Sequence, residues 1–272
     1  MIPIFRKIRK KMADDNRPLK YFRYALGEIV LVVIGILIAL QVNNWNEVRK
    51  QKAQVGSYTR AMISDLKEDI KQVRHIKFQA EKSYIGLDSL INYCRYLDIE
   101  DMSNLELFLL SSGDGYKPYS WNRASFEEIK SSGILSYFKN DRLINLLVKY
   151  EAFTNHMDLD YQEDIESKAE ARKLLNRVVN RNYSLDLDNL QLIASVGPDS
   201  LKMIDFSKSK IYIELKNQSI DFINKDEALL QEAINTYIEY NENLNTRYDF
   251  ELPKLLKDAE SIIQILEDNY LD

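Results

Sequence analysis

The longest apolar run in the chain extends from Ile29 to Leu40 and contains no polar side chain. Glu28 and Gln41 bracket this run, and aromatic residues stand at its edges, with Tyr24 before it and Trp45 after it. The 21 steps from Tyr24 to Trp45 correspond to about 31 Å of α-helix, against roughly 30 Å for the hydrocarbon core of a bilayer. Aromatic side chains favour membrane–water interfaces. The pattern therefore predicts one membrane-spanning helix, residues 24–45, in contact with the lipid bilayer.

Beyond this run, apolar residues recur at intervals of three and four over three long segments, which is the period of an amphipathic α-helix. The segments cover residues 62–94, Asp141 to Asn182, and about Ser207 to the C-terminus. Pro253 is expected to kink or divide the third helix. Because long helices bury their apolar faces against one another, we predict an all-α fold. One N-terminal transmembrane helix is followed by an antiparallel helical bundle of long helices.

Shorter elements are expected between the first two long segments. Residues 103–110 have the pattern of a short helix, and residues 111–123 form a loop by their two glycines and one proline. Ser125 to Glu128 has the sequence of a capping box, which predicts a helix with Ser125 as its N-cap. Gly133 is expected to end that helix in the left-handed conformation. Residues 185–198 are expected to be a connector.

Charge is distributed unevenly on the two sides of the apolar run. The first 23 residues carry eight basic and two acidic side chains, whereas the whole chain has a net charge of −5. Because basic segments stay in the cytoplasm, we expect a cytoplasmic leader (1–23), the transmembrane helix (24–45) and an extracytoplasmic domain (46–272). In a bacterium with two membranes, the chain is then a single-pass inner-membrane protein with a periplasmic domain. The negative charge of that domain argues against nucleic acid as a partner.

A cleaved signal peptide is the alternative interpretation of the apolar run. It requires small residues at the −3 and −1 positions, but Leu37 stands two places before Ala39, and no cysteine directly follows the run. An uncleaved anchor is therefore favoured. Gly35 and Ala39 form a small-xxx-small pair through which two such helices could associate as a homo-oligomer. Glu28 lies one turn after Tyr24, so its carboxylate can reach the headgroup region.

Two stretches of the sequence resemble a known family. The stretch GEIVLVVIGILIALQVNNWNE (27–47), with its signature GEIxLVVxGILIALQxNNWNE, and the looser SFEEIKSSGILSYFKNDRLINLLVKYEAF (125–153) are similar to a bacterial domain-of-unknown-function family of single-pass membrane proteins. Together they cover about a quarter of the chain. The resemblance implies a membrane anchor with a helical domain and implies no activity. Ile134 departs from the family pattern, which often carries a charged residue at this position.

The chain offers few residues for chemistry. It has two histidines, and the motifs of metalloproteases, serine hydrolases and nucleotide-binding loops are absent from the sequence. The best candidate is a metal site made of His156, Asp160 and Asp164, because spacings of four place them on one helical face and three such groups can hold a divalent ion. More often such residues form an exposed polar face, and Glu163–Asp164 is interpreted as solvated. No cofactor is expected.

The loop that contains Tyr116, Tyr119 and Trp121 has two interpretations. Aromatic loop residues can anchor a binding partner, or they can cover the end of the helical bundle, which is the commoner arrangement. The expected function is that of an adaptor or accessory subunit which binds a protein partner in the cell envelope. The alternatives are a membrane-tethered metal-dependent enzyme, a ligand-binding sensor domain, and a helical spacer without a specific ligand.

Overall fold

The computed structural model describes residues 18–113, 115–117, 121–184, 192–197 and 200–271. The chain divides into two compact units, Met1–Ser57 and Tyr58–Asp272. Helix α2 (Pro18–Tyr96) contributes residues to both units. The predicted leader lies mostly outside the described residues.

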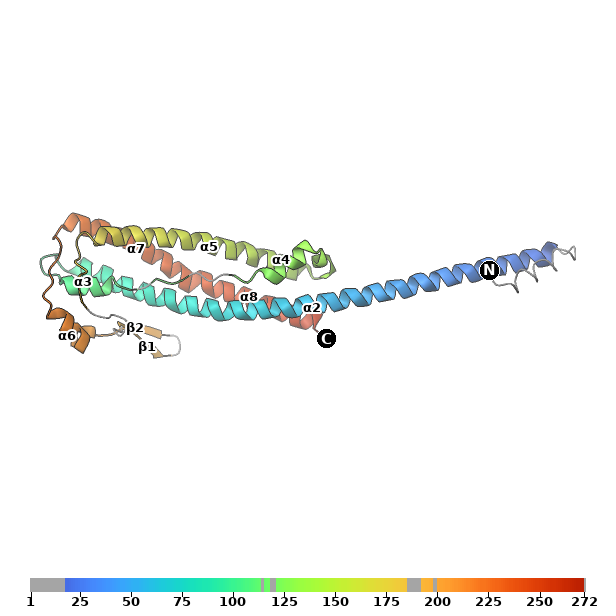
Figure 1. Cartoon of the computed structure of the whole chain (residues 1–272), viewed down its shortest axis with the longest axis horizontal. Helices are drawn as coiled ribbons and strands as arrows, with labels where there is room; N and C mark the ends of the chain where they lie inside the picture. Colours follow the sequence, from blue (N-terminus) through green and yellow to red (C-terminus); the bar gives the residue numbers. More distant parts are fainter. Residues whose placement is uncertain (1–17, 114, 118–120, 185–191, 198–199, 272) are drawn as a thin grey trace. The chain divides into compact units, whose positions relative to one another are not determined.

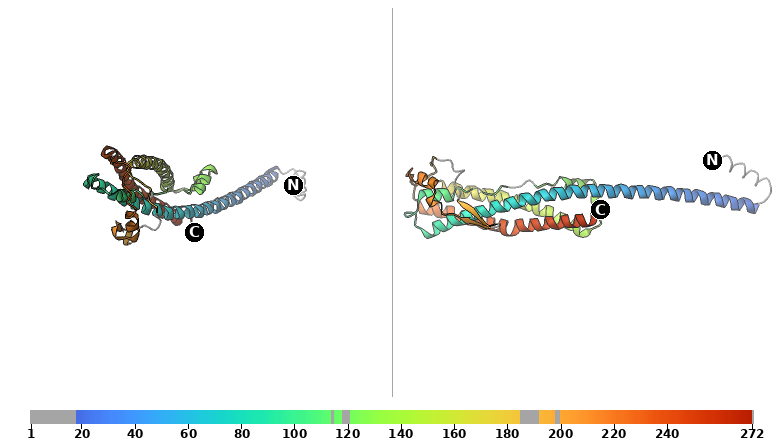
Figure 2. Two further views of the ribbon diagram at one scale, coloured as in Figure 1. Left: turned by 60° about the vertical axis from the view of Figure 1, so that its left-hand side comes forward. Right: turned by 90° about the horizontal axis from the view of Figure 1, so that it is seen from below.

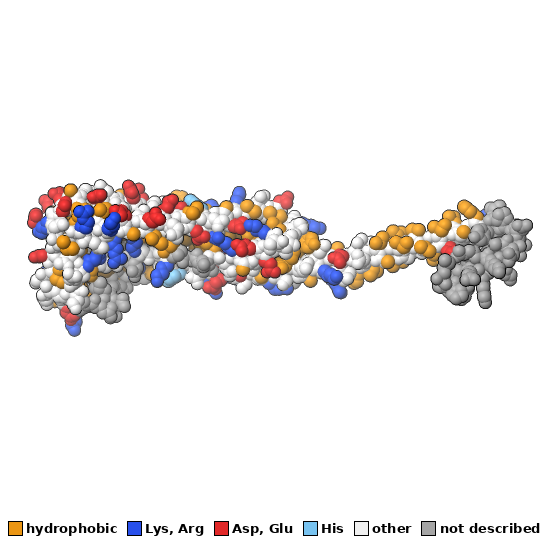
Figure 3. All heavy atoms as spheres, turned by 45° about the horizontal axis from the view of Figure 1, so that its top comes forward, with side chains coloured by type: hydrophobic (Ala, Val, Ile, Leu, Met, Phe, Trp, Pro, Cys, Tyr) orange, Lys and Arg blue, Asp and Glu red, His pale blue; other side chains and the backbone are white. Residues whose placement is uncertain are grey.

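In the first unit, α2 carries an apolar segment that is exposed along its length. The large apolar side chains between Leu26 and Val42 are exposed, and Figure 3 shows hydrophobic side chains along this part of the helix. By length and composition this helix can cross a membrane, and none of its most apolar stretch is buried. An α-helix suits such an environment because it satisfies its backbone hydrogen bonds internally. The structure therefore has the long apolar helix that the sequence predicts.

The second unit is a bundle of long helices. It consists of the part of α2 after residue 57, α5 (Asp141–Leu175), α7 (Glu227–Thr246) and α8 (Leu252–Tyr270), which lie side by side in Figures 1 and 2. Helix α5 packs against both α7 and α8. The interior is filled by aliphatic side chains with Tyr237 among the largest that are fully buried. The predicted all-α fold class is confirmed.

Contacts between α2 and α8 show that these two helices run antiparallel. Lys67 and Arg74 of α2 form ion pairs with Glu267 and Glu260 of α8, at 3.1 Å and 3.2 Å between nitrogen and oxygen. As residue numbers rise along α2 from Lys67 to Arg74, those of the paired residues on α8 fall from Glu267 to Glu260. These pairs are exposed and contribute little to stability, so the buried apolar faces hold the helices together.

The short elements follow the expected pattern with one exception. Helix α3 spans Asn104–Leu110, α4 spans Ala124–Ser131, and the 3₁₀ turn η1 spans Ile134–Tyr137. Gly133 has φ of 76°, so the predicted left-handed stop is confirmed.

The predicted capping box at Ser125 is wrong, because the N-cap of α4 is Arg123. Contacts to other helices fix the chain just before the helix. The Arg123 guanidinium donates to Asp158 at 2.7 Å, and the Asn122 N–H donates to Asp69 at 3.2 Å. These tertiary contacts set the first turn of α4 in place of a local cap.

The third predicted helical segment is divided into several elements. After the 3₁₀ turn η3 (Phe206–Lys208), α6 (Lys210–Lys216) is a separate short helix, and the N-cap of α7 is Asp226, whose carboxylate accepts from the Leu229 N–H at 3.0 Å. The connection holds Ser219 at a positive φ of 50°. Similarly, α5 ends at Leu175, seven residues before the expected end at residue 182.

Among the described residues, a small β-hairpin is the only β-structure. Strand β1 (Ile193–Gly197) pairs antiparallel with β2 (Ser200–Met203), with Ile193 opposite Met203. The hairpin begins inside the segment that was expected to be a connector. Ile193 is buried and approaches α2 at Gly86, where an added Cβ would lie 3.7 Å from its Cδ1. Two short strands are marginal alone, so this contact with α2 supports the hairpin.

A π-helical turn, η4 (Arg247–Glu251), joins α7 to α8. The Leu252 N–H donates to the carbonyl of Arg247, five residues earlier, instead of four. Pro253 follows at the start of α8 and has no N–H to continue an α-helical pattern. The predicted division of this segment near Pro253 is confirmed.

Candidate functional site

The π-helical turn directs Arg247 into the bundle, where it lies among three carboxylates. Its Nε is 3.2 Å from Asp164 Oδ2, and its Nη1 is 3.2 Å from Asp160 Oδ2 and 2.6 Å from Glu251 Oε2. Arg247 is 6 % exposed and Asp164 is 2 % exposed. We call Asp160, Asp164, Arg247 and Glu251 the ionic cluster.

Local sequence explains how the ionic cluster forms. Asp160 and Asp164 are four residues apart, so both lie on one face of α5, and Arg247 and Glu251 have the same spacing across η4. The wide π turn places a long polar side chain on a face that otherwise buries apolar residues. A guanidinium suits this position because its fork of donors can serve several carboxylates at once.

Tyr116, from the loop before α4, contacts the ionic cluster. Its hydroxyl donates to Asp164 Oδ2 at 2.6 Å. Burial, and after it the charge of Asp164, raises the pKa of Tyr116, so the hydroxyl keeps its proton and acts as a donor. The loop reaches this position at Gly115, where an added Cβ would lie 3.0 Å from Lys168 Nζ and 3.1 Å from the Tyr240 hydroxyl.

The electrostatic balance of the ionic cluster depends on Arg247. Burial opposes the charge of its guanidinium, but the carboxylates of Asp164, Glu251 and Asp160 offset this and raise the pKa of Arg247 above its usual range. Burial raises the pKa of Asp160, against the lowering influence of Arg247 and His156. The cluster holds three acidic groups and one arginine, and Asp164 Oδ1 has no hydrogen-bond partner within the described residues.

The three predicted metal-site residues are only partly brought together. His156 Nε2 lies 3.2 Å from Asp160 Oδ2 and 3.6 Å from Glu251 Oε1, and the possible ligand atoms of these residues lie within 4.8 Å of one another. Asp164 instead pairs with Arg247. Because the guanidinium contacts both Asp160 and Glu251, it already supplies the positive charge that a divalent ion would bring. The donor set is therefore a poor fit for a resident metal.

The acidic residues on this face of α5 are less exposed than the sequence indicated. Asp160 is 8 % exposed and Asp164 is 2 % exposed, so the interpretation of Glu163–Asp164 as a solvated pair is wrong for Asp164. The reason is long-range: the face lies against Arg247 and Tyr116, which are 83 and 48 positions away in sequence. Pairing with these groups is what makes burial of the carboxylates tolerable.

The predicted aromatic loop lies against the bundle where it is described. Tyr116 is buried, whereas Trp121 is half-buried and its Nε1 donates to Asp158 Oδ1 at 2.8 Å. Tyr119 lies outside the described residues. A second group of polar contacts fixes the loop to α2, because Asn122 Nδ2 donates to Asp65 Oδ1 at 2.8 Å.

The predicted span residues lie on α2. Gly35 has nothing within 4 Å of an added Cβ, and Trp45 is 66 % exposed, with the Arg49 guanidinium 5.9 Å from its ring centroid. Ala39 is exposed and Glu28 is partly exposed. The side chain of Tyr24 lies outside the described part of the chain.

Arg247 and Glu251 are the residues that sequence reasoning missed. The signal was present, because both fall on the apolar stripe that includes Leu244 and Leu255, at steps of three and four. A charged residue on an otherwise buried stripe indicates a buried partner of opposite charge. The partner helix could then be sought among segments that carry carboxylates at the same spacing.

Comparison with known proteins identifies a family. A family model described as a family of unknown function (DUF6090) matches residues 28–176. The match includes the apolar run and the segment 125–153, so the expectation of an uncharacterised family is confirmed. No curated protein and no solved structure shows significant similarity to the chain.

Proposed function

The chain belongs to DUF6090, a family of unknown function, and we propose that it is a membrane-anchored interaction protein of the bacterial envelope. The observation that carries this proposal is the exposed apolar segment of α2 between Leu26 and Val42, of which no part is buried in the structure. Exposure of so many large apolar side chains to water would be unfavourable at about 25 cal/mol per Å². A bilayer removes that cost.

In the proposed topology the N-terminus is cytoplasmic and the helical bundle is periplasmic. The excess of basic residues before the apolar run supports this orientation, since lysine and arginine favour the cytoplasmic side. The chain would then be a single-pass protein of the inner membrane, and Trp45 would lie at the periplasmic interface.

An adaptor or accessory role is favoured over a catalytic one by the state of the ionic cluster. Its carboxylates are engaged by Arg247, and a metal-dependent enzyme would need that guanidinium to move away first. The proposed partner is another protein of the envelope, and a second copy could associate through Gly35 and Ala39.

Topology can be tested in cells with single cysteines in a Cys94→Ala background. Cys94 is the only cysteine, and burial raises the pKa of its thiol to about 12. Lys257→Cys, at an exposed position of α8, should react with a membrane-impermeant maleimide once the outer membrane is permeabilised. The control variant Lys10→Cys should react only after lysis. The reverse pattern would contradict the proposed orientation.

The adaptor role can be tested by purifying the full chain from native membranes in mild detergent. A stoichiometric envelope protein that remains bound after washing, and is identified by mass spectrometry, would support it. Recovery of the chain alone as a monomer would contradict the role. Recovery as a dimer that Gly35→Leu separates would replace the adaptor role with self-association through the span.

A further inference from the structure

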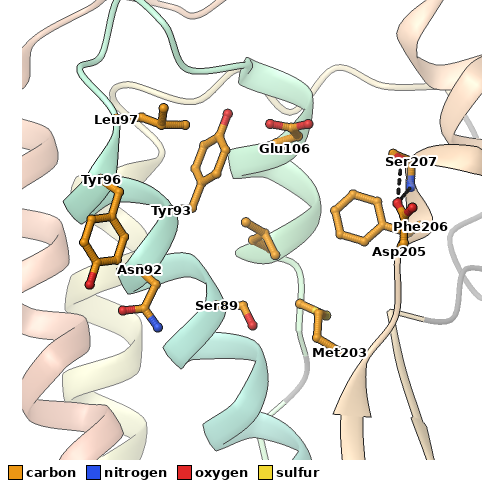
Figure 4. A pocket seen from close by; sticks show the side chains of 11 residues that line it. Ser89, Asn92, Tyr93, Tyr96, Leu97, Glu106, Met203, Asp205, Phe206 and Ser207 are labelled. Carbon is orange, nitrogen blue, oxygen red and sulfur yellow. Dashed lines mark hydrogen bonds between the residues drawn. The ribbon is translucent and has the colours of Figure 1, made fainter.

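A groove of about 490 Å³ lies in the second unit, between the last turns of α2, helix α3 and the segment that follows β2 (Figure 4). This volume falls within the range of small-molecule sites in proteins. The groove does not include any residue of the ionic cluster. It is therefore a separate feature of the bundle.

Aromatic rings and carboxylates dominate the chemistry of the groove. Tyr93 and Tyr96 come from α2, Phe206 follows β2, and the acidic residues Glu106 and Asp205 also line the space. Figure 4 shows Tyr93 and Phe206 on opposite sides, with Glu106 of α3 between them. None of the described residues that line the groove is lysine, arginine or histidine, so an anionic ligand would find no opposite charge among them.

Glu106 is held in place by a neutral donor. The Tyr212 hydroxyl donates to Glu106 Oε1 at 3.0 Å. Tyr93 lies near the same carboxylate, and burial, followed by the influence of Glu106, raises the pKa of Tyr93. No Lys, Arg or His side chain forms an ion pair with Glu106 among the residues that the structure describes. Its negative charge is thus oriented without being neutralised.

Asp205 differs from Glu106 because it already has a basic neighbour. Lys208 Nζ lies 3.2 Å from Asp205 Oδ2, and both side chains are exposed. The other oxygen, Asp205 Oδ1, accepts from the Ser207 N–H at 3.2 Å, so both oxygens of this carboxylate are already engaged. The oriented charge that is open to a ligand therefore belongs to Glu106.

We propose that this groove binds a small organic ammonium cation, with the ammonium group on Glu106 and the apolar body between Tyr93 and Phe206. A carboxylate supplies the ion pair, and aromatic faces attract cations through their quadrupoles. The apolar part of the ligand would displace water from the aromatic walls. The proposal concerns a ligand site and does not depend on the adaptor role.

The probe for this site is 2-phenylethylamine, with the uncharged 2-phenylethanol as a ligand of matched shape. Binding is measured by isothermal titration calorimetry on the full chain in nanodiscs of zwitterionic lipid, with empty nanodiscs as the control for partition. The amine should show saturable binding that exceeds binding of the alcohol by about tenfold or more. Equal binding of the two compounds, or no saturable binding of the amine, would overturn the proposal.

Two matched variants locate the site. Glu106→Gln keeps an acceptor for Tyr212 but removes the negative charge. It should weaken binding of the amine by about tenfold and leave binding of the alcohol unchanged. Glu100→Gln makes the same change at an exposed residue outside the groove, which pairs with Lys225, and should leave binding unchanged. If Glu106→Gln lowers the melting temperature, Phe206→Leu tests the aromatic wall instead. Unchanged amine binding in a folded Glu106→Gln or Phe206→Leu protein would refute the site.

Discussion

Arg247 Nε lies 3.2 Å from Asp164 Oδ2. The two residues are 83 positions apart in sequence, and their contact links the π-helical turn to α5. The contact ties the C-terminal helices to α5 through charges that are almost completely buried. A pair of this kind constrains how the helices can pack, because either charge alone would be costly in the interior.

Replacement of Arg247 by alanine should destabilise the bundle strongly. The change leaves Asp160 and Asp164 buried without their counter-charge, and removal of one partner from a buried pair costs about 3–5 kcal/mol. Thermal unfolding of the full chain in detergent, followed by circular dichroism, measures the effect. Arg74→Ala is the matched control, because its pair with Glu260 is exposed and should contribute less than about 1 kcal/mol. Equal losses in the two variants would contradict the structural role of the cluster.

Tyr116→Phe should cost less than loss of Arg247 but more than an ordinary surface change. It removes the 2.6 Å hydrogen bond to Asp164 and leaves that carboxylate with one donor fewer, at about 1.5–3 kcal/mol for a bond to a charged group. Tyr137→Phe serves as the control, since Tyr137 is exposed. The same melting experiment compares the two, and a Tyr116→Phe protein as stable as the control would show that this hydroxyl is not needed.

Asp160 should give the bundle a pH dependence of known sign. Burial raises its folded-state pKa above the ordinary value of 3.8, so the folded protein binds this proton more tightly than the unfolded chain does. The stabilisation of the folded state by this proton on Asp160 is fully present below pH 3.8, and it is lost as the pH rises through the raised pKa.

The comparison that isolates this effect is between the natural chain and Asp160→Asn. Relative to that variant, the natural chain should lose stability as the pH increases from about 3.8 upward. Melting temperatures measured across that range provide the test. A difference between the two proteins that stays constant with pH, or grows in favour of the natural chain, would show that the pKa of Asp160 is not raised.

Divalent metals should not stabilise the natural chain. Arg247 lies between Asp160 and Glu251 and already supplies positive charge there. Zinc or manganese added at about 100 μM, which is 100 times a micromolar Kd, should therefore leave the melting temperature unchanged. Removal of metal with EDTA should leave it unchanged as well. A rise of several degrees with zinc that His156→Ala abolishes would instead establish the metal site and restore the enzyme hypothesis.

Two glycine-to-alanine substitutions should act in opposite directions. Gly133 has a φ of 76°, so Gly133→Ala is strained and should destabilise by about 1 kcal/mol even though an added Cβ meets nothing within 4 Å. Gly86 lies inside α2 and has space for a methyl group 3.7 Å from Ile193 Cδ1, so Gly86→Ala should stabilise by up to about 1 kcal/mol. Urea unfolding distinguishes the two signs, and a shared sign would contradict one of the two backbone arguments.

The helical architecture could be predicted because its causes are local. Apolar residues at intervals of three and four identify the long helices, and Gly133 and Pro253 act through their own backbone restrictions. The capping box failed at Ser125 because Arg123 and Asn122 are held by contacts with other helices. The β1–β2 hairpin was missed because its strands are short and depend on a contact with α2 for support.

The ionic cluster could be predicted only in part. His156, Asp160 and Asp164 are recognisable from their spacing on one helix, but their partner lies on a segment more than 80 positions away. Spacing therefore showed that acidic groups gather on α5 without showing what neutralises them. An arginine instead of a metal ion performs that role, and this choice depends on how α5 meets the π-helical turn.

Because of the π-helical turn, a change in chain length could alter the buried ion pairs without altering the arrangement of the helices. Such a turn accommodates one residue more than the α-helical turn it replaces, so a chain shortened by one residue at the exposed Phe250 could return to regular α-helix while α8 kept its apolar face toward the bundle. Arg247 and Glu251 would then be three residues apart instead of four, and the guanidinium would meet a different set of oxygens. A single codon deletion at this point would change the charge arrangement of the interior while the architecture stayed the same.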